Sequence, residues 1–285
     1  MKVGFAGLGQ MGAPMATHLL DWPGGLVVCD ARREACEPLI AGGAEVVSDA
    51  GGLVAAGARV VCVMVRDDAQ VEQVVREIVA ASGEEPQDDP LIVAVHSTIG
   101  PHLAPALTEQ TSASAVVVVD APVSGGVQGA REATLAVMVG AEPDVFERCR
   151  PVLERLGGLV MNTGPAGSAT RTKLARNLLQ YVGFVAAYEA QRLAEAAGVD
   201  LRQLAAVVRH SDGITGGPSS IMVRPTAMPM APDDPLAPIF AHVRDLAEKD
   251  LSLALGLADE LGVVLPVARL ASGLFPASVG LAPAP

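Results

Sequence analysis

Lysine is scarce in this chain of 285 residues. Three of its 20 basic residues are lysines, namely Lys2, Lys173 and Lys249, so arginine carries almost all of the positive charge. Arginine does not lose its proton in proteins, whereas a lysine can act as an acid or a base once burial lowers its pKa. The few lysines are therefore candidates for a chemical role.

Aromatic residues, cysteines and long apolar runs are also few. Aromatic side chains make up 3% of the chain, so its cores must be built mainly from Ala, Val, Leu and Gly. The four cysteines, Cys29, Cys36, Cys62 and Cys149, lack CxxC or Cys/His spacing. This predicts reduced core thiols, no metal site and a cytoplasmic location. No apolar run reaches the roughly 20 residues of a membrane span, and residues 1–9 are typical of a strand entering a glycine turn rather than of a signal peptide.

The charge balance is strongly acidic, with a formal net charge of -12. Such a field repels phosphate backbones and anionic lipid, which predicts neither a nucleic-acid nor a membrane partner. Local backbone donors can still bind a small anionic ligand.

Continuous Val, Ile and Leu runs fill the first half, at residues 2–7, 26–29, 59–65, 91–95 and 115–119. Runs of this kind are typical of strands buried on both faces, and helical segments such as 69–80 separate them. The alternation predicts a parallel, doubly wound sheet that ends with a strand at 134–139, a helix at 144–156 and a strand at 158–161. Residues 84–90, which are acidic and contain proline, predict a loop.

The alternation of apolar strand runs and helical segments ends near Gly167. Residues 168–198 contain no proline and carry apolar side chains at helical spacing, which predicts one long helix. Further helices are expected at 201–210, 240–261 and 263–274, with an irregular segment at 213–238.

A glycine turn follows the first strand and opens a helix. It fits the pattern GxGxxG through Gly7, Leu8, Gly9, Gln10, Met11 and Gly12. The first glycine permits the tight turn, the second lets backbone amides approach a pyrophosphate, and the third allows close helix–strand packing. Asp30 ends the second strand, where an acid accepts hydrogen bonds from ribose hydroxyls. A ligand-free turn is the alternative.

These features predict the α/β fold class. An N-terminal doubly wound Rossmann domain, residues 1–163, binds NAD(P), and an all-α substrate and dimerisation domain, residues 164–285, is joined to it through the long helix. An acid such as Asp30 would repel a 2′-phosphate, which favours NAD. Arg32 and Arg33 could neutralise one instead, so NADP stays open.

A second loop of small residues, Ser124, Gly125 and Gly126, leaves a predicted strand. Adjacent glycines let successive amides point one way, which suits a carboxylate, although an ordinary turn has the same composition. Lys173 and Asn177 lie one helical turn apart, so they share a face of the long helix. A lysine there could move the proton of an alcohol while the amide orients it. A solvated lysine and a surface asparagine are the alternatives.

Three further polar residues have open interpretations. Thr98 follows a strand, where ligands sit in such sheets, or it caps a helix. His96 is a rival proton donor without an identified partner. Lys249 contacts a cofactor or forms a surface pair with Asp250.

Four motifs in order along nearly the whole chain resemble the β-hydroxyacid dehydrogenase family, which includes 3-hydroxyisobutyrate dehydrogenases and tartronate semialdehyde reductases. They are GFAGLGQMGAPMATHLL (4–20), DAPVSGGVQGAREATLAVMVG (120–140), GSATRTKLARN (167–177) and KDLSLAL…LGVVLP (249–266).

The resemblance implies hydride transfer between NAD(P) and a small 3-hydroxy acid or its semialdehyde, in a homodimer or homotetramer. It implies that Lys173 transfers the proton, that Ser124, Gly125 and Gly126 bind the substrate carboxylate, and that Asn177 orients the substrate. It also implies cofactor contacts from Met64, Val65, Thr98 and Lys249.

The chain departs from the family pattern at His96, Ala133, Ala169 and Arg176, where an acid, two glycines and an asparagine are usual. Two alternatives to the dehydrogenase remain. An imine reductase-like enzyme would share the cofactor half but usually lacks lysine at position 173, and a catalytically silent dinucleotide-binding protein would not need Lys173, Asn177 or Ser124.

Overall fold

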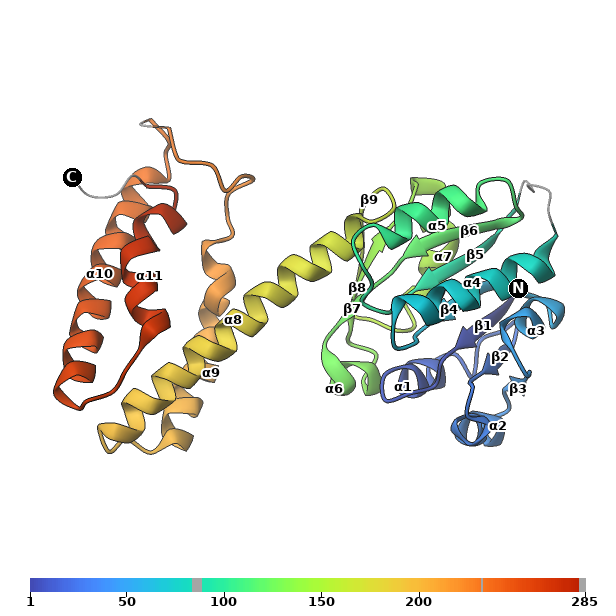
Figure 1. Cartoon of the computed structure of the whole chain (residues 1–285), viewed down its shortest axis with the longest axis horizontal. Helices are drawn as coiled ribbons and strands as arrows, with labels where there is room; N and C mark the ends of the chain where they lie inside the picture. Colours follow the sequence, from blue (N-terminus) through green and yellow to red (C-terminus); the bar gives the residue numbers. More distant parts are fainter. Residues whose placement is uncertain (84–88, 232, 282–285) are drawn as a thin grey trace. The chain divides into compact units, whose positions relative to one another are not determined.

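The computed structural model describes residues 1–83, 89–231 and 233–281. Its contacts divide the chain into two compact units, Met1–Asn177 and Leu178–Pro285. The first is an α/β unit and the second is all-α, as the sequence predicts (Figure 1).

The α/β unit contains one mixed sheet of nine strands within the described residues. The strands are β1 (Lys2–Ala6), β2 (Leu26–Cys29), β3 (Glu45–Val46), β4 (Ala58–Val63), β5 (Leu91–Val95), β6 (Val116–Asp120), β7 (Val123–Ser124), β8 (Ala136–Gly140) and β9 (Leu159–Gly164). Their order is β3-β2-β1-β4-β5-β6-β8-β7, with β9 also paired to β8. The order reverses between β1 and β4, and ligands bind beyond the carboxyl ends of strands at such a switch point.

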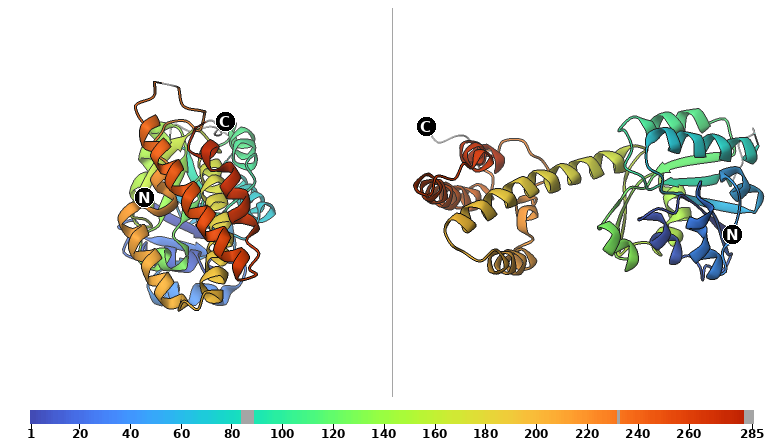
Figure 2. Two further views of the ribbon diagram at one scale, coloured as in Figure 1. Left: turned by 90° about the vertical axis from the view of Figure 1, so that its left-hand side faces the viewer. Right: turned by 60° about the horizontal axis from the view of Figure 1, so that its bottom comes forward.

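Each central strand is buried on both faces, which explains its continuous apolar sequence. In β4, Val60 and Cys62 belong to one core, whereas Val61 and Val63 belong to the other. Helices cover both faces, as Figure 2 shows in its right-hand view. One core takes side chains from α1 (Gly12–Thr17), α2 (Glu37–Ala41), α6 (Gly126–Arg131) and α7 (Pro143–Leu153). The other takes them from α3 (Ala50–Ala55), α4 (Asp68–Ser82) and α5 (Leu103–Thr111). A short 3-10 helix, η1 (Arg33–Cys36), precedes α2.

The prediction of an all-parallel sheet is wrong at one end. β8 runs antiparallel to β6 and to β7, with Val123 opposite Val137, while β9 is parallel to β8. The reason is local: β7 turns the chain back beside β8, and only residues 125–135 connect β7 to β8, fewer than the roughly dozen residues that a parallel crossover requires. Of the loop predicted at 84–90, residues 84–88 lie outside the described residues.

Helix α8 (Ser168–Ala196) is the predicted long helix. Its first turns belong to the α/β unit because the carboxylate of Asp120 accepts hydrogen bonds from the backbone amides of Gly167 and Thr170. The predicted domain boundary between residues 163 and 164 stays a prediction.

The helical unit continues with α9 (Leu201–Thr215), η2 (Gly217–Ile221), α10 (Ala237–Glu260) and α11 (Pro266–Ser278). The segment predicted as irregular at 213–238 therefore begins with the end of α9 and a 3-10 turn. Buried Glu189 of α8 accepts hydrogen bonds from the amides of Val267 and Ala268, both at 2.8 Å, and so caps the start of α11.

Candidate active site

The glycine turn between β1 and α1 has two positions that admit only glycine. Gly7 has a φ of +91°, and a Cβ there would overlap the carbonyl oxygen of Met64. A Cβ on Gly12, where α1 begins, would overlap the carbonyl oxygen of Gly7. Close packing of the turn against β4 and of α1 against the turn thus accounts for both.

Protein packing does not account for Gly9. It is exposed, and a Cβ built on it would meet no atom within 4 Å. A glycine whose missing side chain faces open space fits a backbone that a bound phosphate must approach closely. The turn is therefore suited to the pyrophosphate of a dinucleotide. Of its other predicted members, Leu8 is buried, Gln10 exposed and Met11 half-buried.

A cleft of about 590 Å³ opens beside this turn at the switch point of the sheet. Five of the predicted cofactor residues line it, namely Gly7, Gly9, Asp30, Met64 and Val65. The lining continues along α3 and α4 through residues such as Asp49 and Glu77. The structure thus brings together predicted cofactor residues that are up to 58 positions apart in the sequence.

Asp30 is held in a fixed position at this cleft. One carboxylate oxygen accepts a hydrogen bond from the amide of Leu8 at 2.6 Å, and the other accepts from the amide of Arg32 at 2.8 Å. The Arg32 Nε lies 3.9 Å from the carboxylate, and the Arg32 side chain is 66% exposed. The bond to Leu8 ties the acid directly to the glycine turn.

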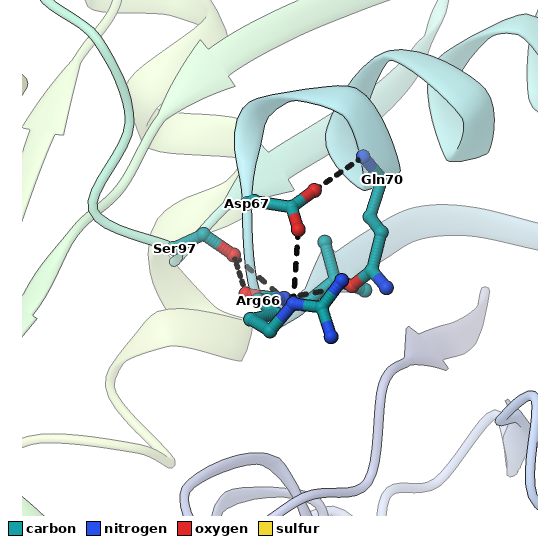
Figure 3. A network of polar contacts seen from close by, with 5 residues as sticks. Arg66, Asp67, Gln70 and Ser97 are labelled. Carbon is teal, nitrogen blue, oxygen red and sulfur yellow. Dashed lines mark hydrogen bonds and ion pairs between the residues drawn. The ribbon is translucent and has the colours of Figure 1, made fainter.

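The segment after β4 is fixed by Ser97, which the sequence interpretation missed. Its buried hydroxyl accepts a hydrogen bond from the amide of Val65 at 2.9 Å and donates one to the carbonyl of the same residue at 2.7 Å. Figure 3 shows this clamp beside Arg66 and Asp67. The amide of Arg66 donates to the side-chain oxygen of Gln70 at 3.0 Å, which fixes the next residue. The sequence feature that could have identified Ser97 is a polar residue two positions after the buried strand β5.

Asp67 begins helix α4 by capping it. Its carboxylate accepts from the amide of Gln70 at 3.0 Å and from the Arg66 side chain at 2.9 Å. The hydrogen bond from Gln70 and that from Arg66 lower the pKa of Asp67.

Thr98 is exposed in the loop after β5, and the residue that precedes α5 is His102, so Thr98 does not cap that helix. Its predicted contact with the nicotinamide stays a prediction.

His96 is buried, with 1% of its surface exposed. Its Nδ1 lies 2.8 Å from the carbonyl oxygen of Ala121, and its ring stacks on Phe5 with centroids 6.4 Å apart. Because the Ala121 carbonyl can only accept, Nδ1 carries the proton and Nε2 is bare. Burial lowers the pKa of His96 to about 4. The imidazole is therefore neutral near pH 7 and is a poor proton donor.

The predicted substrate loop leaves the sheet through β7. Gly125 and Gly126 are exposed and have φ angles of +139° and +64°, which side-chain-bearing residues rarely adopt. Ser124 precedes them and is half-buried. Consecutive glycines in these conformations give an accessible run of backbone amides beside a hydroxyl, which suits an anion better than an apolar group.

Lys173 differs from the other two lysines in its surroundings. It lies on the first turns of α8 and is 8% exposed, whereas the exposed Lys249 pairs with Asp250 at 3.3 Å and Lys2 pairs with Glu45 at 2.7 Å. Burial, and secondly the positive charge of Arg176, lowers the pKa of Lys173. This places the amine closer to the range in which a lysine can both take and give a proton.

Asn177 lies one turn beyond Lys173 and is half-buried. Its side-chain oxygen accepts a hydrogen bond from the Arg176 guanidinium at 3.4 Å, and its predicted contact with the substrate stays a prediction. Lys249 lies on α10 in the helical unit, and its predicted contact with the cofactor stays a prediction.

The described residues contain no group of three or more His, Cys, Asp or Glu side chains that could hold a metal ion. Nor does any helix in the described ranges combine the length and hydropathy needed to cross a membrane. All four cysteines are buried free thiols.

The switch-point cleft with its glycine turn and anchored acid defines the class as a dinucleotide-binding protein of the Rossmann type. Comparison with known families agrees. Residues 2–164 match the NAD-binding domain of 6-phosphogluconate dehydrogenase, and residues 167–281 match the corresponding domain of NADP-dependent 3-hydroxyisobutyrate dehydrogenase.

Individual relatives cover almost the whole chain. An uncharacterized oxidoreductase of Mycobacterium tuberculosis H37Rv is 48% identical over 281 residues, which are 98% of this chain and 94% of that one. The 3-hydroxyisobutyrate dehydrogenase of Pseudomonas aeruginosa PAO1 is 33% identical over 277 residues, covering 96% and 90%. The crystal structure of a putative oxidoreductase from Mycobacterium avium 104 is 45% identical with a TM-score of 0.90, covering 98% of each chain.

The chain belongs to the β-hydroxyacid dehydrogenase family and is an NAD(P)-binding oxidoreductase. An imine reductase from Myxococcus stipitatus shares the fold, with a TM-score of 0.75, 19% identity and coverage of 98% and 93%. That likeness concerns the fold alone.

Proposed function

We propose that this protein transfers a hydride between NAD(P) and the CH–OH carbon of a small 3-hydroxy acid or its semialdehyde. The observation that carries the proposal is the burial of the Lys173 residue, which lowers the pKa of its amine. The family supplies the reaction type, and the residues of this chain supply the proton transfer.

A nicotinamide bound in the cleft would supply the hydride acceptor or donor. In the oxidation direction the neutral amine of Lys173 takes the hydroxyl proton as the C–H bond breaks. In the reduction direction the protonated amine returns that proton to the carbonyl oxygen. Lysine can do both because its lowered pKa leaves each form accessible, which arginine cannot match.

The substrate is held by groups that recognise a carboxylate and a hydroxyl. Ser124 and the amides of Gly125 and Gly126 bind the carboxylate, while the amide of Asn177 holds the hydroxyl close to Lys173. A 3-hydroxy acid places these two groups two carbons apart, so one small molecule can contact both ends of the site.

We propose NAD as the preferred cofactor and NADP as the alternative. Both oxygens of Asp30 accept backbone hydrogen bonds, which fix the position of the carboxylate at the adenosine end of the cleft. A 2′-phosphate placed there would meet a fixed negative charge, whereas ribose hydroxyls can donate to it.

The helical unit supports a proposal about assembly. Its buried apolar side chains, within the described residues, are Phe240, Ala258, Val263, Leu265, Pro276 and Val279. Large apolar side chains of α8 are exposed instead, including Tyr181, Phe184 and Tyr188 at 59% each. A second copy of this chain, presenting the same apolar helices, would cover them in a homodimer or homotetramer. We expect the assembly in the cytoplasm, with neither a nucleic-acid nor a membrane partner.

Two alternatives remain in the proposal. An imine reductase would reduce a C=N bond and would not need the carboxylate loop. A silent dinucleotide-binding protein would bind NAD(P) without turnover.

A panel of 3-hydroxy acids, starting with 3-hydroxyisobutyrate, separates these possibilities when each is mixed with NAD or NADP and the absorbance of the reduced nicotinamide is followed. The dehydrogenase turns over at least one of the acids. Cofactor binding without turnover of any of these acids would contradict the proposal. Turnover of cyclic imines alone, measured in the same assay, would also contradict it.

The role of Lys173 is tested in the same assay. Lys173→Ala is expected to lower kcat by about 10²- to 10⁴-fold, the usual contribution of a general acid or base, and to leave the Kd of the cofactor unchanged. Lys2→Ala, which removes a half-buried lysine at the start of β1, is the matched control.

A further inference from the structure

Asp120 is a buried carboxylate with no part in the proton transfer described above. It ends β6 and has no exposed surface. One oxygen accepts a hydrogen bond from the amide of Gly167 at 2.7 Å, and the other accepts from the amide of Thr170 at 2.6 Å. Both donors belong to the start of α8, so a strand of the sheet supplies the cap of the long helix.

The surrounding structure is adapted to this carboxylate. Gly140 of β8 is paired with Asp120, and a Cβ on Gly140 would overlap a carboxylate oxygen of Asp120. Gly167 has a φ of +84°, which lets its amide turn toward the strand. Burying a charge costs free energy unless hydrogen bonds compensate for it, and here two short ones do.

Asp120 is close in sequence to the candidate substrate loop and is connected by its hydrogen bonds to the helix that carries Lys173. Four residues after it comes Ser124, which begins the substrate loop, and three residues after its bonded partner Thr170 comes Lys173. Three residues of an α-helix rise about 4.5 Å. One carboxylate therefore fixes the strand that leads to the loop against the helical turn that carries the amine.

We propose that Asp120 is a positioning residue that holds Lys173 at a constant spacing from the loop formed by Ser124, Gly125 and Gly126. This rests on the proposed function, because it takes Lys173 as the proton-transfer residue. Asp120 touches neither substrate nor cofactor and acts only through the start of α8. A displacement of about 1 Å in a reacting group can lower a rate by about 10²-fold.

The test is Asp120→Asn in the full-length protein. The asparagine keeps the shape but presents an NH₂ group to one of the two amides, so one hydrogen bond is lost. We expect kcat to fall by about 10²-fold while the KM for NAD stays within about twofold, since the spacing of the amine changes and the cofactor cleft does not.

Glu189→Gln is the matched control. Glu189 is also a buried carboxylate that accepts from two amides at a helix start, but it caps α11 in the helical unit. We expect the two variants to lose similar thermal stability and only Asp120→Asn to lose kcat. Equal losses of kcat in both variants, or a folded Asp120→Asn protein with kcat within twofold of the wild type, would overturn the proposal.

A second measurement does not depend on turnover. Competitive labelling of amines with acetic anhydride across a pH series, followed by peptide mass spectrometry, gives the titration of each of the three lysines separately. In Asp120→Asn we expect Lys173 to become reactive at a higher pH than in the wild type, because its amine gains contact with water and its pKa rises. In Glu189→Gln it should label as in the wild type.

These readouts distinguish the two hypotheses. Wild-type turnover in Lys173→Ala removes the proposed function, whatever the labelling shows. Loss of turnover in Lys173→Ala, together with unchanged labelling and kcat in Asp120→Asn, removes the role of Asp120 alone.

Where Asp120→Asn does not fold, Gly140→Ala displaces the carboxylate without removing it and should also lower kcat. Failure of both variants to fold counts against a positioning role, since the carboxylate would then be required for the fold itself.

Discussion

The chemistry of Lys173 depends on the charges and burial around one amine. Burial is the larger cause of its lowered pKa, and the guanidinium of Arg176, three residues further along α8, is the second. The family usually has an asparagine in place of Arg176, so this chain adds a positive charge that directly favours the neutral amine.

Arg176→Gln is therefore expected to raise the pKa of Lys173. In the oxidation direction kcat rises with pH as the amine loses its proton, so the rising limb of the kcat profile should move to higher pH. The pH dependence of kcat at saturating substrate measures this. Arg171→Gln removes a charge from the same exposed helix and should leave the limb in place; an unmoved limb in Arg176→Gln would exclude the electrostatic effect.

At the same scale, we expect Asp30 to govern the choice between NAD and NADP. Asp30→Ala should weaken binding of NAD more than that of NADP, because it removes an acceptor for the ribose hydroxyls and a charge that repels the 2′-phosphate. Loss of one hydrogen bond to a charged group corresponds to about 1.5–3 kcal/mol, or roughly 10- to 100-fold in Kd for NAD. Fluorescence titration with both cofactors gives the ratio, and an unchanged preference would remove Asp30 from the adenosine site.

At the scale of elements, two buried carboxylates attach α8 to its neighbours. Asp120 of β6 caps its beginning, and Glu189 within α8 caps the beginning of α11. In each case, backbone amides at the start of a helix, which have no acceptor within that helix, donate to a carboxylate from a different element. Long-range contacts, and not local helix propensity, therefore fix these two helix starts.

Glu189→Gln should lower the free energy of unfolding by about 1–3 kcal/mol, since one part-buried amide of α11 loses its acceptor. Urea unfolding followed by circular dichroism measures the change. Glu195→Gln alters an exposed acid on the same helix and is expected to stay within about 0.5 kcal/mol of the wild type. A Glu189→Gln protein as stable as that control would show that the cap contributes nothing.

The elements that could be predicted from sequence are those with strong internal patterns. β1, β2, β4, β5 and β6 are continuous apolar runs, and the proline-free segment after Gly167 forms α8. β3 has only two residues, Glu45–Val46, and α3 contains two glycines, so neither carries a periodic signal. Helix α9 continues beyond the predicted residue 210 through Ser211, Asp212 and Gly213, which are weak helix formers that tertiary structure overrides.

The same contrast applies to the candidate site. Gly7, Gly9 and Asp30 were predictable because a short motif encodes their contacts. Ser97 and Asp120 were not, because their hydrogen bonds reach 32 and about 50 positions along the chain and appear only once the strands are in order. Burial likewise separates Lys173 from Lys2 and Lys249, a distinction that sequence could only suggest through the rarity of lysine.

At the scale of the whole molecule, the exposed apolar side chains of the helical unit predict self-association. Tyr181 and Phe184 form an edge-to-face pair on α8, with ring centroids 5.9 Å apart and 59% of each residue exposed. Two charges introduced here, as Tyr181→Asp with Phe184→Asp, should convert the oligomer to monomer by placing carboxylates in an apolar interface.

Sedimentation velocity of the wild type and the double variant tests this prediction. Arg202→Asp on α9 changes an exposed charged residue and serves as the control. A wild-type protein that is monomeric at micromolar concentration would contradict the proposed assembly.

The proposed function depends on the amine of Lys173, which is expected to move the proton of the substrate. Its most direct test is chemical rescue of Lys173→Ala by methylamine, with kcat followed at saturating NAD and 3-hydroxy acid. We expect kcat of the variant to be about 10²- to 10⁴-fold lower, its cofactor binding to be normal, and its turnover to rise in proportion to the concentration of neutral methylamine but not with guanidinium. Wild-type-like turnover of Lys173→Ala without any added amine would contradict it.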